Sequence, residues 1–391
     1  MIKYSLGIDI SMKMFHACLS VIDDKQQVRV KSSKKFSNNV TGFKELWWWI
    51  EKHYKQKQIP LHIIMEATGV YYEHCALYLF KQGFTLAVVL PNKAKKYLQA
   101  TGLKSKNDKI DAQGLAKMGA EQKLEPWQPM DDFYYTLRSL TRHHESLQAL
   151  KTNISNQLHA DNAGTNANKQ VGKQLNKLIG TINKQIGDIE KSIEVHLTCD
   201  KAVQQKVKGI LKIKGVGIMT VATLLAETNG FLLFKNAPQL VSYCGYDVIE
   251  NQSGSHKGKT KISKKGNRHI RRILHMPAFN VVRYQVSPFL QLYNRTIEKH
   301  HTKMKSYVAV QKKLLVIIYC LWKNNQSFDQ NHCNQSKTGD VESVQPCRLN
   351  FAEVVAAEQK SSPETNQGAT QGVQPLKYHR LHPLGFCKNK A

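Results

Sequence analysis

The N-terminal 125 residues alternate between strand-like and helix-like patterns, and this alternation constrains the fold more than any other feature of the chain. Three strand-like segments come first, and the short gaps between them predict antiparallel neighbours. They cover Tyr4–Ile10, Phe15–Ile22 and Gln27–Ser33. Helices are then predicted over Thr41–Tyr54, Tyr71–Lys81 and Asn92–Thr101, and further strands over Ile59–Glu66 and Thr85–Leu90. Together these segments predict an α/β sheet domain over residues 1–125.

The order of these elements is the ribonuclease H type of arrangement, although topology alone does not establish a function. At 126–206 the pattern changes to long polar segments with Leu and Ile at heptad-like intervals, which predicts a coiled-coil helical hairpin that links domains or pairs subunits. Residues 207–323 are predicted to form a third, mostly helical unit with a Gly- and Lys-rich loop at 251–267. From 324 to 391 no period persists, and this composition predicts a largely disordered tail.

The net charge of the chain is +28, from 57 Lys and Arg against 29 Asp and Glu. Such an excess predicts a polyanionic partner, and nucleic acid is the first candidate. From Asp329 onward seven cations face six acids, so residues 1–328 carry +27. The body of the protein, and not its tail, is therefore expected to hold the nucleic acid.

The eight cysteines are scattered without a Cys-x-x-Cys pair, which predicts reduced thiols in the cytoplasm and no zinc site. No apolar run approaches the roughly 20 residues of a membrane span, so no membrane partner is expected. The chain enters a strand-like segment directly after Met1, which predicts no signal peptide. For a protein bound to chromosomal DNA, the expected location is the cytoplasm, in association with the nucleoid.

Four acidic residues form the first candidate site. Asp9 interrupts one apolar run and Glu66 ends another, positions at which an unpaired charge is unfavourable. Asp108 and Asp111 are three residues apart, so a helix would place both carboxylates on one face. Any one of these residues alone is most simply a surface acid. Taken as a set in a basic chain, they predict hard oxygen ligands for Mg²⁺ and chemistry on phosphodiesters.

Gly215-Val216-Gly217 is the second candidate site, because it stands between two apolar, helix-like segments. A Gly-x-Gly turn at a helix N-terminus exposes backbone N–H groups that can bind a phosphate without sequence preference. We therefore predict a helix-hairpin-helix contact to the DNA backbone, with a plain structural turn as the alternative.

The third candidate site is the serine, glycine and lysine loop. Ser253 is followed by glycine, so its hydroxyl is expected to be exposed and could act as a nucleophile. Ser255 is an equally exposed alternative. Cations that could hold the scissile phosphate follow in the sequence. They are Lys257, Lys259, Lys264, Lys265, Arg268 and Arg271. A flexible basic loop that only binds the DNA backbone is the competing interpretation.

Several motifs, in this order along residues 4–322, resemble those of DEDD-type insertion-sequence transposases of the IS110 family (IS116/IS110/IS902-like), which are bridge-RNA-guided recombinases related to the Piv invertase. The motifs are Gly7-Ile8-Asp9-Ile10-Ser11, Met65-Glu66-Ala67-Thr68-Gly69-Val70-Tyr71, Lys106-Asn107-Asp108-Lys109-Ile110-Asp111-Ala112, the Gly215-Val216-Gly217 turn, Gln252-Ser253-Gly254 and Ile262-Ser263-Lys264-Lys265-Gly266-Asn267-Arg268. The tail matches nothing in the family pattern.

The resemblance implies a RuvC-like N-terminal domain, a coiled-coil linker and a C-terminal transposase domain. It implies a metal tetrad of Asp9, Glu66, Asp108 and Asp111, with Ser253 as the residue that becomes joined to DNA. It also implies a structured guide RNA that pairs with both DNAs, as in other RNA-guided systems. Because strand exchange needs at least two sites, a homo-oligomer, either a dimer or a tetramer, is expected.

Two other functions stay open at this stage. A RuvC-like structure-specific endonuclease would use a metal-activated water and no serine, and a non-catalytic nucleic-acid-binding protein would keep the acids only as structural charges. A sugar kinase can also begin with Gly-x-Asp-x-Ser, but the chain has no second phosphate-binding Asp-Gly loop, and its charge disfavours a small-molecule substrate.

Overall fold

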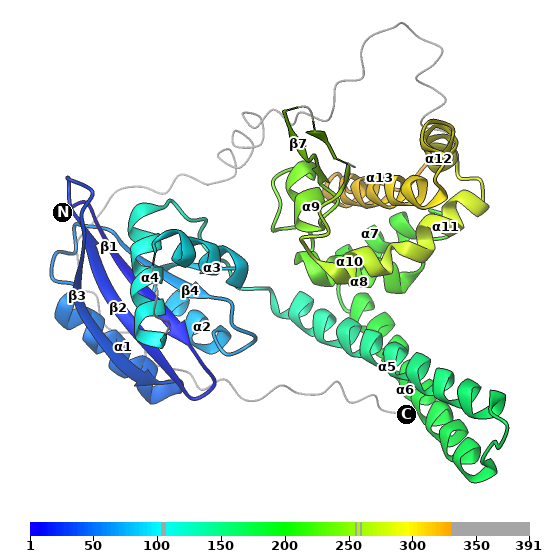
Figure 1. Cartoon of the computed structure of the whole chain (residues 1–391), viewed down its shortest axis with the longest axis horizontal. Helices are drawn as coiled ribbons and strands as arrows, with labels where there is room; N and C mark the ends of the chain where they lie inside the picture. Colours follow the sequence, from blue (N-terminus) through cyan, green and yellow to red (C-terminus); the bar gives the residue numbers. More distant parts are fainter. Residues whose placement is uncertain (103–106, 255, 259, 331–391) are drawn as a thin grey trace, which may run out of the picture. The chain divides into compact units, whose positions relative to one another are not determined.

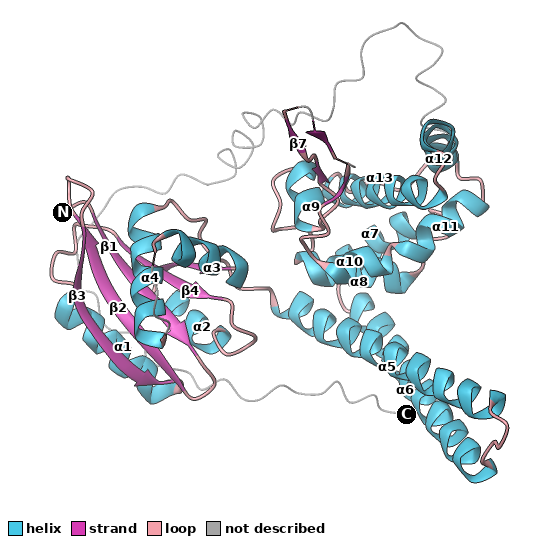
Figure 2. Ribbon diagram, viewed as in Figure 1, coloured by secondary structure: helices cyan, strands magenta, loops and turns pink. Residues whose placement is uncertain are grey.

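A computed structural model of the chain describes residues 1–102, 107–254, 256–258 and 260–330. The expected disordered tail therefore lies outside the described residues from 331 onward, as do Ser255 and Lys259. No helix in the described ranges combines the length and the apolar character that a membrane crossing requires. The described part consists of a mixed sheet with its helices and, after it, a mostly helical region (Figures 1 and 2).

The N-terminal sheet has the strand order β3-β2-β1-β4-β5. β1 pairs antiparallel with β2, and β2 with β3, whereas β1–β4 and β4–β5 are parallel. The three antiparallel strands followed by two parallel ones confirm the order predicted from the sequence. The strands are β1 (Lys3–Ile10), β2 (Met14–Ile22), β3 (Val28–Ser37), β4 (Leu61–Glu66) and β5 (Thr85–Val89).

Helices cover both faces of this sheet. α1 packs aromatic and aliphatic side chains on one face, where Trp49 meets Phe36 edge to face at 5.8 Å between ring centroids. α4 lies on the opposite face, against β1, β2 and β4. The helices of this region are α1 (Val40–His53), α2 (Glu73–Lys81), α3 (Pro91–Ala100) and α4 (Asp108–Glu121). The helical spacing expected for Asp108 and Asp111 is thus present.

α5 (Asp132–Ala163) and α6 (Lys169–Thr198) form an antiparallel pair of long helices (Figure 1). A small apolar cluster of Leu147, Ile154, Ile182 and Ile186 lies between them. A short turn of residues 164–168 joins the two helices. The hairpin arrangement matches the sequence pattern, and its role in linking domains or pairing subunits stays a prediction.

The following region is built around one apolar core, to which the first part of α5 and the end of α6 also contribute. Its longest helix is α13, which buries Leu314, Leu315, Ile318 and Trp322. The helices are α7 (Lys201–Leu211), α8 (Ile218–Thr228), α9 (Ala237–Tyr243), α10 (Arg268–Ile273), α11 (His275–Arg283), α12 (Ser287–His300) and α13 (Lys303–Lys323).

The segment predicted as a loop at 251–267 instead takes part in two short antiparallel strand pairs. β6 (Val248–Ile249) pairs with β9 (Lys261–Ile262), and β7 (Gln252–Ser253) pairs with β8 (His256–Lys257). Each strand has only two residues, and only the β6–β9 pair contains residues that favour strands, Val248, Ile249 and Ile262.

Candidate functional site

Gly7 fixes the approach of α4 to the sheet. A Cβ atom at this position would collide with the backbone of α4, at the oxygen of Ala112 and the nitrogen of Ala116. Further along α4, a Cβ at Gly119 would meet the side chains of Ser5 and Ile64. Because side chains alternate between the faces of a strand, Asp9 lies on the same face as Gly7 and Ser5, which is the face that α4 covers.

The strand register places Glu66 beside Asp9. β1 and β4 are parallel with Ile8 opposite Met65, so the next residues along the two strands are Asp9 and Glu66. Glu66 also shares its face with Ile64, which α4 covers. Both acids are half-buried. Two of the four predicted carboxylates thus lie on adjacent strands, at the same end of the sheet and on the same face.

The N-terminus of α4 brings the other two carboxylates to this end. Asn107 caps the helix, because its Oδ1 accepts a hydrogen bond from the Ile110 N–H at 2.9 Å. Asp108 and Asp111 occupy the first turn, immediately before Ala112 reaches Gly7. Negative side chains are favourable here because they face the positive end of the helix dipole. The sequence motif therefore supplies a cap, two acids and a close-packing alanine within six residues.

His16 belongs to the same cluster, although sequence reasoning did not select it. It pairs with Asp9 across β1 and β2, and its Nδ1 lies 3.7 Å from Oδ2 of Asp108. Burial lowers the pKa of His16, whereas the charge of Asp108 acts to raise it and those of Lys35 and Lys109 act to lower it. The imidazole is therefore expected to be neutral at pH 7.

The donor types at this end of the sheet suit a divalent cation, which prefers carboxylate oxygens. Asp9, Glu66, Asp108 and Asp111 are the residues that could hold it. In the described part of the chain, however, no group of three His, Cys, Asp or Glu side chains is arranged closely enough to bind a metal ion. The backbone thus places the carboxylates together, and their side chains would have to turn toward one another on binding.

Ser253 lies in the short β7–β8 hairpin, where it pairs with His256. It is exposed, and the next residue, Gly254, has a φ of +56°, a conformation that suits glycine. The hydroxyl is thus presented at a hairpin turn, as a nucleophile for a large substrate would need to be. Lys257, one of the predicted cations, is the last residue of β8.

The basic segment after this hairpin is held by polar contacts to its surroundings. The Ser263 hydroxyl donates to Oδ1 of Asp247 at 2.6 Å, and Asn267 caps α10 by accepting from the N–H groups of His269 and Ile270. Lys264, Lys265 and Arg268 are exposed, as expected for contacts to DNA. Arg271 is only half-buried and donates to the carbonyl of Cys244 at 2.8 Å, so part of its role is structural.

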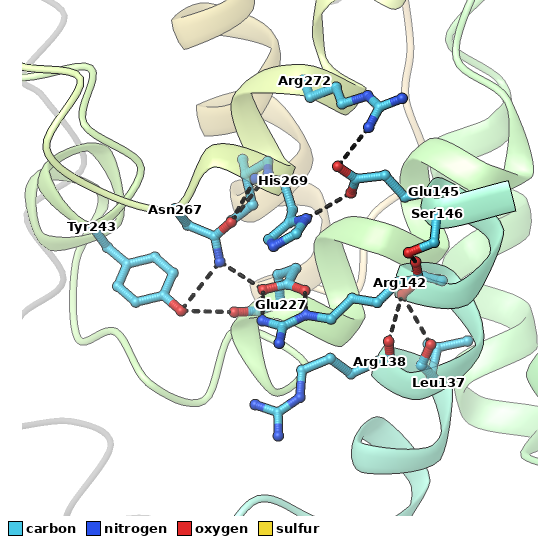
Figure 3. Close-up of polar contacts among 12 residues, drawn as sticks. Leu137, Arg138, Arg142, Glu145, Ser146, Glu227, Tyr243, Asn267, His269 and Arg272 are labelled. Atoms are coloured by element: carbon cyan, nitrogen blue, oxygen red, sulfur yellow. Dashed lines mark hydrogen bonds and ion pairs between the residues drawn. The ribbon is translucent and has the colours of Figure 1, made fainter. Parts of the chain in front are cut away.

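A buried carboxylate, Glu227 of α8, connects this segment to α5 (Figure 3). Its side chain is 2% exposed and receives two hydrogen bonds from Arg142, at 2.7 and 2.9 Å. Asn267 donates its Nδ2 to the same carboxylate at 2.7 Å, and the Tyr243 hydroxyl donates to the Glu227 backbone carbonyl. Burial acts to raise the pKa of Glu227, but the donors Arg142 and Asn267 lower it below the usual glutamate value.

Glu145, one turn after Arg142 in α5, makes a second connection. Its carboxylate contacts Nδ1 of His269 at 2.6 Å and accepts from Nη1 of Arg272 at 2.7 Å. Figure 3 shows both connections reaching α10 from α5. Both the N-cap of α10 and the residues within α10 are therefore connected to the long helix α5.

Replacing Arg142 with methionine is expected to destabilise the protein by about 3 kcal/mol at pH 7, because it leaves a buried carboxylate without its main partner. In the wild type the lowered pKa of Glu227 gives stability that is complete above the ordinary glutamate range and is lost as the pH falls below it. The difference between the two proteins should therefore shrink from pH 7 to pH 4 in urea unfolding experiments.

Arg272→Met is the matched control for this prediction. Arg272 is 51% exposed, and its partner Glu145 keeps the contact with His269, so a loss of only about 0–1 kcal/mol is expected. Equal losses in the two variants would show that Glu227 does not depend on Arg142.

The predicted Gly-x-Gly turn joins α7 to α8. Gly215 has a φ of +99° and packs against Asn280 and Val281 of α11, so a side chain at this position would be strained and crowded. Gly217 is the N-cap residue of α8, is exposed and has open space around it. Of the two glycines, Gly217 is the better placed for a phosphate, and Gly215 has a packing role.

Two family models match this chain. One is described as a transposase model of the DEDD IS110 type and covers residues 6–161, and the other as the transposase IS116/IS110/IS902 family and covers residues 207–294. The first range contains the four carboxylates, and the second contains Ser253 and the basic segment.

The chain is also similar to the pilin gene-inverting proteins of Moraxella bovis and Moraxella lacunata. Each is 29% identical over 334 residues, which cover 84% of this chain and 99% of the relative. Among solved structures, RuvC of Thermus thermophilus, alone and with a Holliday junction substrate, aligns with 32% of this chain and 99% of its own at 11% identity and a TM-score of 0.25. At that level neither structure establishes a shared fold.

Proposed function

Because this chain belongs to the IS116/IS110/IS902 transposase family and is an enzyme that acts on DNA, we propose that it cuts and rejoins DNA at the ends of an insertion sequence by a metal-dependent reaction through a serine. The observation that carries the proposal is the placement of Asp9, Glu66, Asp108 and Asp111 at one end of one sheet face. A bound divalent cation would stabilise the charge that develops on the phosphate.

The proposed role of Ser253 is to conserve the energy of the broken DNA bond. Its Oγ attacks the scissile phosphorus as one P–O bond to a deoxyribose breaks. The serine proton passes to solvent, and the departing sugar oxygen takes up a proton. Attack by a sugar hydroxyl of another strand then reverses these steps and frees the serine. The exposure of Ser253 at a hairpin turn supports this role.

Rejoining, as opposed to cutting alone, is supported by the relatives, which are named for inverting a gene. Inversion requires that broken ends be joined to new partners, which a simple endonuclease does not do. The proposed active form is a homo-oligomer, a dimer or a tetramer, because exchange between two DNAs needs more than one site. Its proposed partner besides DNA is a structured guide RNA, in agreement with the charge of +27 on residues 1–328.

A cleavage assay with purified protein tests this function. The assay contains DNA of the element's ends, a target DNA and RNA transcribed from the flank of the gene. With Mg²⁺ we expect cleaved DNA, protein-linked DNA and joined products, and with a chelator none of the three. Cleavage that depends on Mg²⁺ but never yields protein-linked DNA would instead identify a RuvC-like endonuclease. Absence of cleavage under all metal conditions, with DNA binding retained, would identify a non-catalytic binding protein.

A further inference from the structure

The cluster of carboxylates continues across the sheet as a row of side chains that changes from negative to positive. Asp9 pairs with His16 across β1 and β2, and His16 pairs with Lys35 across β2 and β3. Paired residues of neighbouring strands lie on the same face of a sheet. With Glu66 beside Asp9, the order across four strands is Glu66, Asp9, His16, Lys35, on the face that α4 covers at Gly7.

Lys109 adds a second cation on this face. It follows Asp108 in the first turn of α4, and its charge, like that of Lys35, acts on His16. It also acts on Cys18, which lies under α4 with Ala112 and Ala116. Lys35 and Lys109 are both exposed, so their ammonium groups are available to a ligand.

The neighbouring Lys34 differs from Lys35, because it lies on the other face of the sheet. Its Nζ lies 5.0 Å from the ring centroid of Phe36, a buried residue that packs against Trp49 of α1. Lys34 therefore points to the opposite face of β3. A basic edge strand can simply prevent aggregation, and Lys34 serves that purpose as well as Lys35 does. That role does not explain why the lysine on the α4 face is aligned with the carboxylates.

We propose that Lys35, Lys109 and His16 bind phosphates of the DNA strand that is cut, on the β3 side of the scissile phosphate. Strands lie about 4.8 Å apart, so Lys35 is about 10 Å from Asp9 across the sheet, a span within reach of a nearby phosphate of the same strand. The cut strand then crosses the sheet face from the β4 side, over the carboxylates, toward the β3 edge.

The two kinds of contact differ in chemistry. The lysines supply charge, whereas His16, next to Asp108, supplies a hydrogen bond from a ring N–H. This inference rests on the proposed function, because it assumes that the carboxylates hold the scissile phosphate. The binding of phosphates by the lysines can nevertheless be measured without any cleavage.

The first test compares how the DNA affinity of Lys35→Ala and of Lys34→Ala depends on salt concentration. A chelator is present, so that no cleavage occurs. Each phosphate contact contributes about 0.9 to the slope of log K against log salt concentration. We expect Lys35→Ala and Lys109→Ala each to lower that slope by about 1, Lys34→Ala to leave it unchanged, and Lys35→Arg to restore it. Identical slopes for Lys35→Ala and Lys34→Ala overturn the proposal.

Cleavage kinetics with Mg²⁺ provide the second test. Lys35→Ala should raise KM several-fold with little change in kcat, and His16→Ala should do the same. His16→Gln, which keeps an N–H donor, should recover most of the loss. A fall in kcat alone for the lysine variants contradicts the proposal. If the wild type does not cleave, the proposed function fails, while slopes specific to Lys35 and Lys109 still support the path of the strand.

Discussion

Asp9→Asn and Asp108→Asn are each expected to reduce DNA cleavage by about 10³-fold or more while leaving the fold intact. A carboxylate that holds a divalent cation contributes several kcal/mol to stabilising the charge on the reacting phosphate, and each 1.36 kcal/mol corresponds to a factor of ten. Asparagine is nearly the same size but carries no charge. Both variants are therefore expected to stay folded, which circular dichroism and thermal unfolding check.

Asp24→Asn is the matched control, because Asp24 is exposed in the turn between β2 and β3, away from the carboxylate end. Its cleavage rate should equal that of the wild type. Mn²⁺ binding, followed by calorimetry on the same proteins, gives a readout that is independent of cleavage. Wild-type cleavage by folded Asp9→Asn or Asp108→Asn would show that these carboxylates do not form the active site.

Most of the N-terminal fold could be predicted from the sequence because β1, β2, β4 and β5 are mainly apolar runs, whereas β3 is a polar, basic edge strand. Asp9 and Glu66 were recognisable as site residues for the same reason, since each is an acid at a place where the pattern requires a buried strand. The Asp108 and Asp111 pair followed from helical spacing alone. These features depend on local periodicity, which a single sequence contains.

His16 could not be predicted because its position depends on register. It belongs to the site only because β2 pairs with β1 so that residue 16 faces residue 9, and a shift of one residue would turn its side chain to the opposite face. A lone histidine in an apolar strand gives no indication of that pairing. Only the length of the turn between the first two strands could have indicated this register.

The contacts that hold the basic segment could not be predicted from the sequence for another reason. Arg142 and Glu227 are 85 residues apart, and a charged residue in an amphipathic helix is most often a solvated one. Glu227 is the last residue but one of a helix whose other residues are nearly all buried, and that apolar context was the signal that could have marked it. The two strand pairs at 248–262 were missed because glycine, serine and lysine are the residues expected of a loop.

Ser253→Ala is expected to abolish the covalent protein–DNA adduct completely, because alanine has no atom that can form a bond to phosphorus. DNA binding should be unchanged, since one neutral hydroxyl contributes little to an affinity that depends on charge. Denaturing gels of reactions with labelled DNA detect the adduct directly. The hairpin should be retained, because Ser253 is exposed and alanine is compatible with a short strand at that place.

The matched control is Ser255→Ala, a change of the same kind two residues away in the same segment. If Ser253 is the nucleophile, Ser255→Ala forms the adduct at a normal level. Loss of the adduct in Ser255→Ala alone would transfer the role to that residue, and adducts in both variants would exclude a serine mechanism. Cleavage in Ser253→Ala at the wild-type rate, combined with the loss of cleavage in Asp108→Asn, would mean that water attacks the phosphate. The carboxylate site would then act as an endonuclease, and the serine would have no part in breaking the strand.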